Sequence, residues 1–144
     1  MFIGEYIHGF DDKNRLSLPV RFRKEMGKRV VITPGLDGCL FVFTLKQWSL
    51  IARRLGDSSL LSADNRSFSR YMLGGAREVE VDSIGRILIP DLLKARAALA
   101  LKAAVVGVES RVEIWNEDAW KSYKAKVEGE ADQLAEKLGS VGVL

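Results

Sequence analysis

Hydrophobic residues alternate with polar ones over several short segments of this chain, most clearly at residues 77–81, Arg-Glu-Val-Glu-Val. A period of two residues is typical of a β-strand that buries one face. Short strands are also predicted at residues 15–18 and 86–89. Two further pairs of strands flank turn-forming residues, and they are predicted at 30–33 with 40–43 and at 103–108 with 111–115. The pattern therefore indicates a strand-rich chain.

Helices are predicted in the intervals between these strands. Pro19 and Pro90 each follow a short strand, and the fixed φ of proline suits the first residue of a helix. Gly27 is placed to end the first of these helices. A capping box at residues 44–47 starts another helix, and a further one is expected at about 64–73, ending at a pair of glycines. Strands and helices together predict the α+β class, with β-structure dominant.

The longest predicted helix follows the last strand. Asn116 is a suitable N-cap, and beyond it apolar residues recur at near-heptad spacing, at Trp120, Tyr123, Val127, Leu134 and Leu138. An apolar stripe on a helix needs a surface that covers it. We expect this stripe to pack on the chain's own core, and the alternative is packing against a neighbouring subunit.

An internal repeat organises these elements. Residues 11–19, Asp-Asp-Lys-Asn-Arg-Leu-Ser-Leu-Pro, match residues 82–90, Asp-Ser-Ile-Gly-Arg-Ile-Leu-Ile-Pro, so that Asp, Arg and Pro recur at an offset of 71. Further along the offset becomes 72, as for Trp48 and Trp120. Two duplicated strand units imply two halves around a pseudo-twofold axis within one globular unit. The expected boundaries are 5–47 for the first repeat, 48–75 for a helical linker, 76–119 for the second repeat, and 120–144 for a C-terminal helix and tail.

Composition and charge narrow the class of protein. The chain has 144 residues, 47% of them hydrophobic, which is enough for one compact domain and excludes a disordered chain. Its single cysteine excludes a disulfide scaffold, and no apolar run reaches the ~20 residues of a membrane span. We expect a soluble intracellular protein. Residues 13–29 carry seven Lys or Arg and one Glu, which suits a polyanionic partner, although a solvated surface gives the same pattern.

Enzymatic chemistry is sparse in this sequence. His8 is the only histidine, and Cys39 lies in an apolar strand without an evident base nearby. A zinc site needs several Cys or His ligands, and no phosphate-binding glycine loop is present. We therefore expect no metal, no cofactor, no small-molecule substrate and no enzymatic activity. The remaining enzymatic alternative uses the paired aspartates of the repeat as acid and base.

The repeated Asp-x-x-x-Arg motif carries most of the functional information. In the structural interpretation, each Asp holds a turn through backbone N–H groups and pairs with its own Arg. In the functional interpretation, Arg15 and Arg86 meet across the pseudo-twofold axis, where a guanidinium can bind guanine bidentately, with about 1–3 kcal/mol of discrimination. Phosphate contacts would come from neighbouring basic residues, namely Lys13, Arg21, Arg23 and Lys24. Four residues are expected to shape the loops: Asp11, Asn14, Asp82 and Gly85.

With these motifs in place, the sequence resembles the MraZ family of bacterial transcriptional regulators. The resemblance covers nearly the whole chain except the last dozen residues. It rests on Phe-Ile-Gly at 2–4, Asp-x-Lys-x-Arg-Leu-Ser-Leu-Pro at 11–19, the Trp48 segment, Leu-Gly-Gly-Ala at 73–76, Asp-x-x-Gly-Arg-Ile-Leu-Ile-Pro at 82–90, and Val-Glu-Ile-Trp at 112–115.

The resemblance implies a fold that composition could not give: two tandem SpoVT/AbrB-type swapped-hairpin halves that form one pseudo-dimeric, double-split β-barrel core with flanking helices. It also implies ring-shaped homo-oligomers in the cytoplasm, associated with the nucleoid. These rings would bind double-stranded DNA at G-rich direct repeats upstream of the division and cell-wall gene cluster.

Carried over residue by residue, the resemblance makes Arg15 and Arg86 the base-reading residues. The sequence departs from the family pattern at Asn14, where the family often has Gly. The second repeat also has Ile84 where the first has Lys13. The second loop is therefore expected to make fewer phosphate contacts. An alternative function from another class is a structural or adaptor ring that binds a protein partner through the helix at 117–138.

Overall fold

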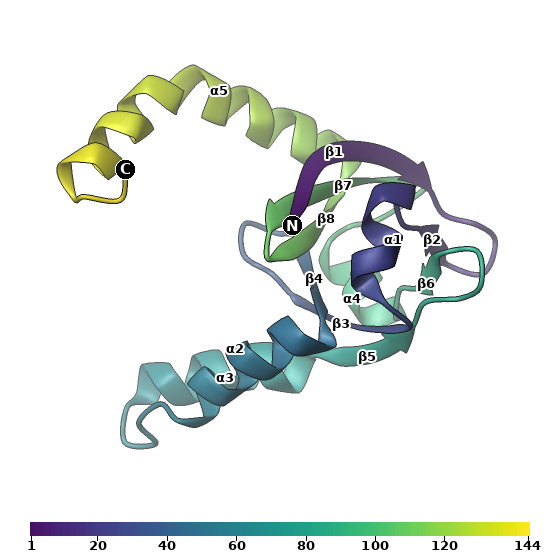
Figure 1. Cartoon of the computed structure of the whole chain (residues 1–144), viewed down its shortest axis with the longest axis horizontal. Helices are drawn as coiled ribbons and strands as arrows, with labels where there is room; N and C mark the ends of the chain where they lie inside the picture. The colour runs from purple at the N-terminus through teal and green to yellow at the C-terminus, as the bar shows by residue number, and fades with distance from the viewer.

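The computed structural model describes all 144 residues and is an α+β structure rich in strands (Figure 1). Its eight strands are β1 (Phe2–Gly9), β2 (Arg15–Ser17), β3 (Arg29–Pro34), β4 (Leu40–Thr44), β5 (Arg77–Glu80), β6 (Arg86–Leu88), β7 (Lys102–Glu109) and β8 (Arg111–Asn116). Its five helices are α1 (Val20–Met26), α2 (Leu45–Gly56), α3 (Ala63–Gly75), α4 (Asp91–Arg96) and α5 (Glu117–Ser140). The predicted α+β class and every predicted strand are confirmed, with ends that differ by one or two residues.

The strands pair in a way that reproduces the internal repeat. Six of them form one antiparallel sheet in the order β1-β7-β8-β4-β3-β5, and β2 pairs with β6 in a separate two-stranded ribbon. The counterparts in the two repeats are β1 and β5, β2 and β6, β3 and β7, and β4 and β8. Replacing each strand of the sheet by its counterpart gives the same order read backwards. The pseudo-twofold axis expected from the sequence therefore passes between β4 and β8 and through the ribbon.

The large sheet remains open, with β1 and β5 as its edges. The expected double-split β-barrel is therefore not confirmed, because no continuous ladder of backbone hydrogen bonds closes the sheet. The physical reason is that the edge regions reach the ribbon only through isolated bridges, Phe10 with Leu16 and Val81 with Ile87. These bridges still hold the ribbon next to the two edges of the sheet.

One hydrophobic core lies between the sheet, the ribbon and the short helices. It comprises 18 buried residues, and Leu16 and Ile87, the middle residues of the two ribbon strands, are fully enclosed in it. Phe22 of α1 meets the rings of Phe2 and Tyr6 edge-on, with centroids 5.3 and 5.5 Å apart. The core therefore fixes the ribbon and α1 in place from one side.

Local signals set the ends of the helices. Gly27 follows α1 with φ 73°, and the hydroxyl of Thr44 accepts the N–H of Gln47 at 3.1 Å, as the glycine stop and the capping box predict. Pro19 and Pro90 are the N-cap residues of α1 and α4 rather than their first helical residues. Their ψ angles of 138° and 143° are extended, so each proline still belongs to the incoming strand segment.

The C-terminal helix α5 is only partly attached to the core (Figure 1). The rings of Trp120 and Tyr123 lie 5.3 and 4.9 Å from the ring of Trp115, which is buried. Beyond them the helix projects away, and Leu134 and Leu138 remain 38% and 41% exposed. The prediction that the whole stripe packs on the chain's own core is wrong for this distal half, because the helix extends past the sheet. None of the helices combines the length and the apolar character that crossing a membrane requires.

Candidate nucleic-acid interface

The β2–β6 ribbon places the two Asp-x-x-x-Arg motifs side by side, at the right of Figure 1. We refer to residues 11–15 as the first loop and to residues 82–86 as the second loop. The antiparallel register pairs Arg15 with Leu88 and Arg86 with Ser17. Because side chains alternate along a strand, burial of the central ribbon residues directs both arginines to the opposite face, away from the core.

Each aspartate holds its own loop with both carboxylate oxygens. Asp11 Oδ1 accepts the backbone N–H groups of Lys13 and Arg15 at 2.9 Å each, while its Oδ2 accepts Arg15 Nε at 2.6 Å. In the second loop, Asp82 Oδ1 accepts the N–H groups of residues 84 and 86 at 3.1 and 2.9 Å. Its Oδ2 accepts Arg86 Nε at 2.7 Å. The two turns are therefore built by the same set of hydrogen bonds.

A contact between the loops joins the two motifs. Arg86 Nη1 lies 3.4 Å from Asp11 Oδ2, the same oxygen that accepts Arg15 Nε. Both guanidinium groups thus meet at one carboxylate. The side chains of Arg15 and Arg86 are 31% and 25% exposed, so part of each planar group remains accessible. The structure brings together the two arginines that the sequence singled out.

These contacts determine the charge of the aspartates. Partial burial works against ionisation of Asp11, but the N–H of Arg15, its guanidinium and the N–H of Lys13 outweigh it and lower the pKa to about 2. The pKa of Asp82 is lowered as well, mainly by the N–H of Arg86. Both carboxylates are charged at neutral pH. They therefore lack the raised pKa that a general acid needs, which removes the basis of the enzymatic alternative.

Backbone conformation and support differ between the loops. Asn14 and Gly85 occupy equivalent positions with φ 59° and 83°, in the left-handed region that asparagine and glycine tolerate best. Asn14 is held by α4, where its Nδ2 donates to Asp91 Oδ1 at 3.2 Å and its Oδ1 accepts Lys94 Nζ at 2.6 Å. Gly85 instead lies against Arg23 of α1. Each loop is therefore supported by the helix of the other repeat.

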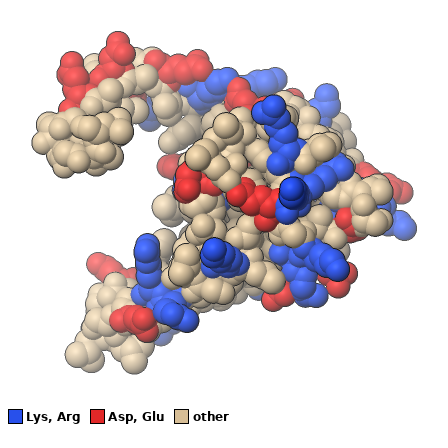
Figure 2. All heavy atoms as spheres, viewed as in Figure 1, with Lys and Arg blue, Asp and Glu red and all other residues tan.

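The remaining predicted basic residues do not join the arginine pair: Lys13 lies in the first loop, and Arg21 and Arg23 lie on α1. Lys13 and Arg21 are exposed, and Arg23 is partly buried, with its Nε donating to the carbonyl of Leu18 at 2.9 Å. Basic side chains gather over α1 in Figure 2, with acidic side chains interspersed. Sequence reasoning missed Lys94. The repeat offset of 71 could have found it, because Lys94 in the second repeat corresponds to Arg23 in the first.

The lone cysteine takes no part in this surface. Cys39 is 1% exposed, and its Sγ–H donates to the carbonyl of Leu36 at 3.2 Å. Burial raises the pKa of its thiol to about 12, with the nearby Glu113 carboxylate acting in the same direction. The thiol is therefore protonated at neutral pH, and Cys39 serves as a small core residue, as predicted.

The fold and this surface define a duplicated, strand-rich α+β protein that presents two arginine loops on one ribbon. A family model described as "MraZ protein, putative antitoxin-like" matches residues 1–71 and 72–139. The chain is 42% identical to the transcriptional regulator MraZ of Alkaliphilus metalliredigens over 99% of this chain and 100% of the relative. It is 44% and 45% identical to the proteins of the same name from Desulforamulus reducens and Moorella thermoacetica, over 96% of this chain and 97% and 96% of those relatives. The chain belongs to the MraZ family, which comprises transcriptional regulators and not enzymes.

Proposed function

We propose that the protein is a DNA-binding transcriptional regulator that reads base sequence with Arg15 and Arg86. The observation that carries the proposal is the meeting of both guanidinium groups at one carboxylate, on the face of the ribbon that points away from the core. Each Nε is occupied by an aspartate, so each guanidinium is oriented before DNA arrives. An arginine that is already held loses less conformational freedom on binding.

The shape of the ribbon supports DNA as the partner. The major groove of B-DNA admits a two-stranded β-ribbon, and a guanidinium there binds guanine O6 and N7 bidentately. In this proposal the base-reading residues are Arg15 and Arg86, and the loop-shaping residues are Asp11, Asn14, Asp82 and Gly85. Phosphate contacts come from Lys13 of the first loop and from Arg21 and Arg23 of α1. G-rich direct repeats upstream of the division and cell-wall genes are the proposed target.

We propose further that several copies act together as a ring, associated with the nucleoid. The net charge of +3 is small for a protein that binds DNA as a single copy at physiological salt. Several linked copies on adjacent repeats gain affinity through effective concentration. Exposed apolar residues on α2, α3 and α5 offer surfaces for such contacts, among them Leu50, Phe68 and Leu134. A monomeric variant that bound the repeats as tightly as wild type would contradict this part of the proposal.

The two halves are proposed to be of the swapped-hairpin type, with boundaries at 5–47 and 76–119, a helical linker at 48–75 and a C-terminal segment at 120–144. The support for this is the pairing between repeats, since β1 pairs with β7 and its counterpart β5 pairs with β3. The interlocked halves therefore share one core.

Fluorescence anisotropy tests the function directly. Wild type, Arg15→Ala and Arg86→Ala are titrated with a duplex of several G-rich direct repeats and with a scrambled duplex, at two salt concentrations. Arg54→Ala serves as the control, because Arg54 is exposed on α2, away from the ribbon. We expect wild type and the control to prefer the repeats, and each ribbon variant to lose that preference while keeping salt-dependent binding.

Equal, weak binding of both duplexes by all variants would contradict the proposal. The adaptor function would then come first, because the distal half of α5 has exposed Leu134 and Leu138 and no partner within the chain. A charge-reversal pair at the two ribbon arginines separates these functions, since it abolishes DNA reading and leaves binding through α5 intact.

A further inference from the structure

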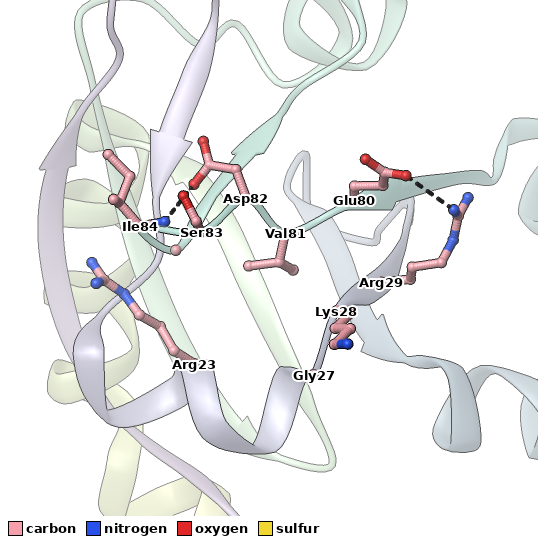
Figure 3. Close-up of a pocket in the computed structure, with 10 residues that line it drawn as sticks. Arg23, Gly27, Lys28, Arg29, Glu80, Val81, Asp82, Ser83 and Ile84 are labelled. Atoms are coloured by element: carbon pink, nitrogen blue, oxygen red, sulfur yellow. Dashed lines mark hydrogen bonds and ion pairs between the residues drawn. The ribbon is translucent and has the colours of Figure 1, made fainter.

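A cavity of about 570 Å³ opens beside the second loop, between that loop and the end of α1 (Figure 3). Residues 80–85 form one wall, and Arg23, Lys28 and Arg29 approach from the other side. In Figure 3, Arg23 lies on the side of Ile84 and Lys28 on the side of Val81. Apart from the side chains of Val81 and Ile84 the lining is polar or glycine, so the cavity offers little surface on which a base could stack.

The charges around this cavity leave two cations without acidic partners. Glu80 pairs with Arg29 at 3.4 Å, and Asp82 pairs with Arg86 at 2.7 Å. Arg23 and Lys28 form no ion pair within 4.0 Å, although both line the cavity. The uncompensated charge of the lining is therefore positive, which suits a small anion.

Arg23 is held in an orientation that suits a phosphate. Its Nε donates to the carbonyl of Leu18 at 2.9 Å, which leaves the Nη1 and Nη2 groups for another acceptor. Gly85 makes this position possible, because a Cβ at that residue would lie 2.2 Å from Arg23 Nε. The glycine therefore gives the guanidinium room against the loop.

The equivalent place in the first repeat is filled. There Lys94 takes the position of Arg23, and its Nζ lies 4.7 Å from the centre of the Phe10 ring and donates to Asn14. In the second repeat, Val81 replaces the phenylalanine and Gly85 replaces the asparagine, so that both filling groups are missing. Lys28 itself corresponds to Leu101, because their carbonyl groups accept the N–H groups of the equivalent residues Val81 and Phe10, so the first repeat has an apolar residue there. The basic cavity thus exists on one side of the pseudo-twofold axis only.

We propose that this cavity binds a phosphate group of the DNA backbone, held by Arg23 and Lys28. The proposal rests on the proposed DNA-binding function and adds Lys28 and a defined place to it. The second loop has Ile84 where the first has Lys13, and α1 of the other repeat supplies the missing cation. The two loops then contact the backbone by different means, the first through its own lysine and the second through a built cavity.

The test measures how DNA affinity depends on salt, because each phosphate contact contributes about 0.9 to the slope of log K against log salt concentration. Arg23→Gln and Lys28→Gln are compared with Arg54→Gln and Lys126→Gln, which remove the same charges from exposed positions on α2 and α5. We expect each cavity variant to lower the slope by about 0.9 on repeat and scrambled duplexes alike, and the controls to leave it unchanged. Arg23→Lys, which keeps the charge, should retain the wild-type slope.

Equal slopes for the cavity variants and the controls would overturn the proposal. So would NMR shifts of Arg23 Nε–H that inorganic phosphate produces and DNA does not, since the cavity would then serve a free anion. The outcome is separate from that of base reading, whose measure is the preference for repeats and its dependence on Arg15 and Arg86. Wild type that binds neither duplex would overturn both proposals.

Discussion

The first and second loops share one hydrogen-bond pattern but differ in what supports them. In both, an aspartate accepts two backbone N–H groups and its own arginine. The first loop is then fixed by polar contacts from Asn14 to α4, whereas the second is kept open by Gly85 beside a basic cavity. The comparison teaches that duplication preserved the chemistry of the turn, while the neighbouring side chains changed what each turn offers to a ligand.

A second difference concerns the shared carboxylate. Asp11 contacts both arginines, at 2.6 and 3.4 Å, whereas Asp82 contacts only Arg86. The link between the loops therefore depends on the first aspartate. The contacts of the aspartates are unequal even though the two loops are built alike.

The largest effect is expected from removing that shared carboxylate. Asp11→Ala releases Arg15 and removes the contact that joins Arg86 to the first loop, although Asp82 still holds Arg86 through its Nε, so the loss of discrimination between repeat and scrambled duplexes should exceed the ~1–3 kcal/mol expected for Asp82→Ala. Anisotropy titrations with both duplexes measure the difference. Asp12→Ala is the control, because Asp12 is exposed and adjacent. Equal losses from the two loop aspartates would show that the contact between the loops does not matter for reading.

The next effect concerns stability. Gly85→Ala puts a side chain at φ 83° and against Arg23, so we expect unfolding in urea to show a loss of about 1–2 kcal/mol. Asn14→Gly removes two hydrogen bonds but relieves the strain of φ 59°, and its loss should stay below about 1 kcal/mol. Gly74→Ala is the matched control, because a Cβ there meets no atom within 4 Å. Equal free energies of unfolding for Gly85→Ala and Gly74→Ala would show that the second loop does not require glycine.

A smaller effect is expected from exchanging the residues that distinguish the loops. Lys13→Ile should lower the salt slope of DNA binding by about 0.9, and Ile84→Lys should raise it by the same amount. The double exchange should return the wild-type slope, since one phosphate contact moves from one loop to the other. A rise after Ile84→Lys without a fall after Lys13→Ile would mean that Lys13 makes no phosphate contact.

The smallest effect is the dependence on pH. The pKa of Asp11 lies at about 2 in the folded protein, below the ordinary value of 3.8 that it regains on unfolding. Its contribution to stability is therefore fully present above about pH 4 and is lost as the pH falls toward 2. An NMR titration of the Asp11 carboxyl group measures this directly, and Asp11→Asn should flatten the stability curve in that range. Titration near the ordinary value would contradict the hydrogen-bond geometry.

Local signals made much of the fold predictable from the sequence. Period-two alternation and flanking turn residues located the strands. Thr44, Asn116 and Gly27 marked helix ends correctly, because their effects act within a single turn. The prolines were assigned one position too far into their helices, since φ alone does not separate an N-cap from a first helical residue. The distal half of α5 was misassigned because apolar spacing predicts a buried stripe and does not say which surface buries it.

The site was predictable to the extent that it is local. The Asp–Arg spacing indicated the pairing within each loop, and the repeat indicated that the loops meet. Contacts between Asn14 and α4, or between Gly85 and Arg23, join residues more than 60 positions apart, so only the tertiary structure reveals them. The cavity was beyond sequence reasoning for the same reason, because it depends on which side chains fail to fill a space.

The crosswise support of the loops has a consequence for how the molecule faces a double helix. If two separate identical chains built this ribbon, both sides would be equal, and the ribbon would look the same from either end. Fusion of the halves into one chain allowed Asn14 and Gly85, and Lys13 and Ile84, to diverge while each loop still rested on the opposite helix. The two ends of the ribbon therefore differ, which gives it a direction. A DNA-binding surface with a direction matches target sites that all have the same orientation along the DNA, whereas a two-fold symmetric surface matches inverted repeats.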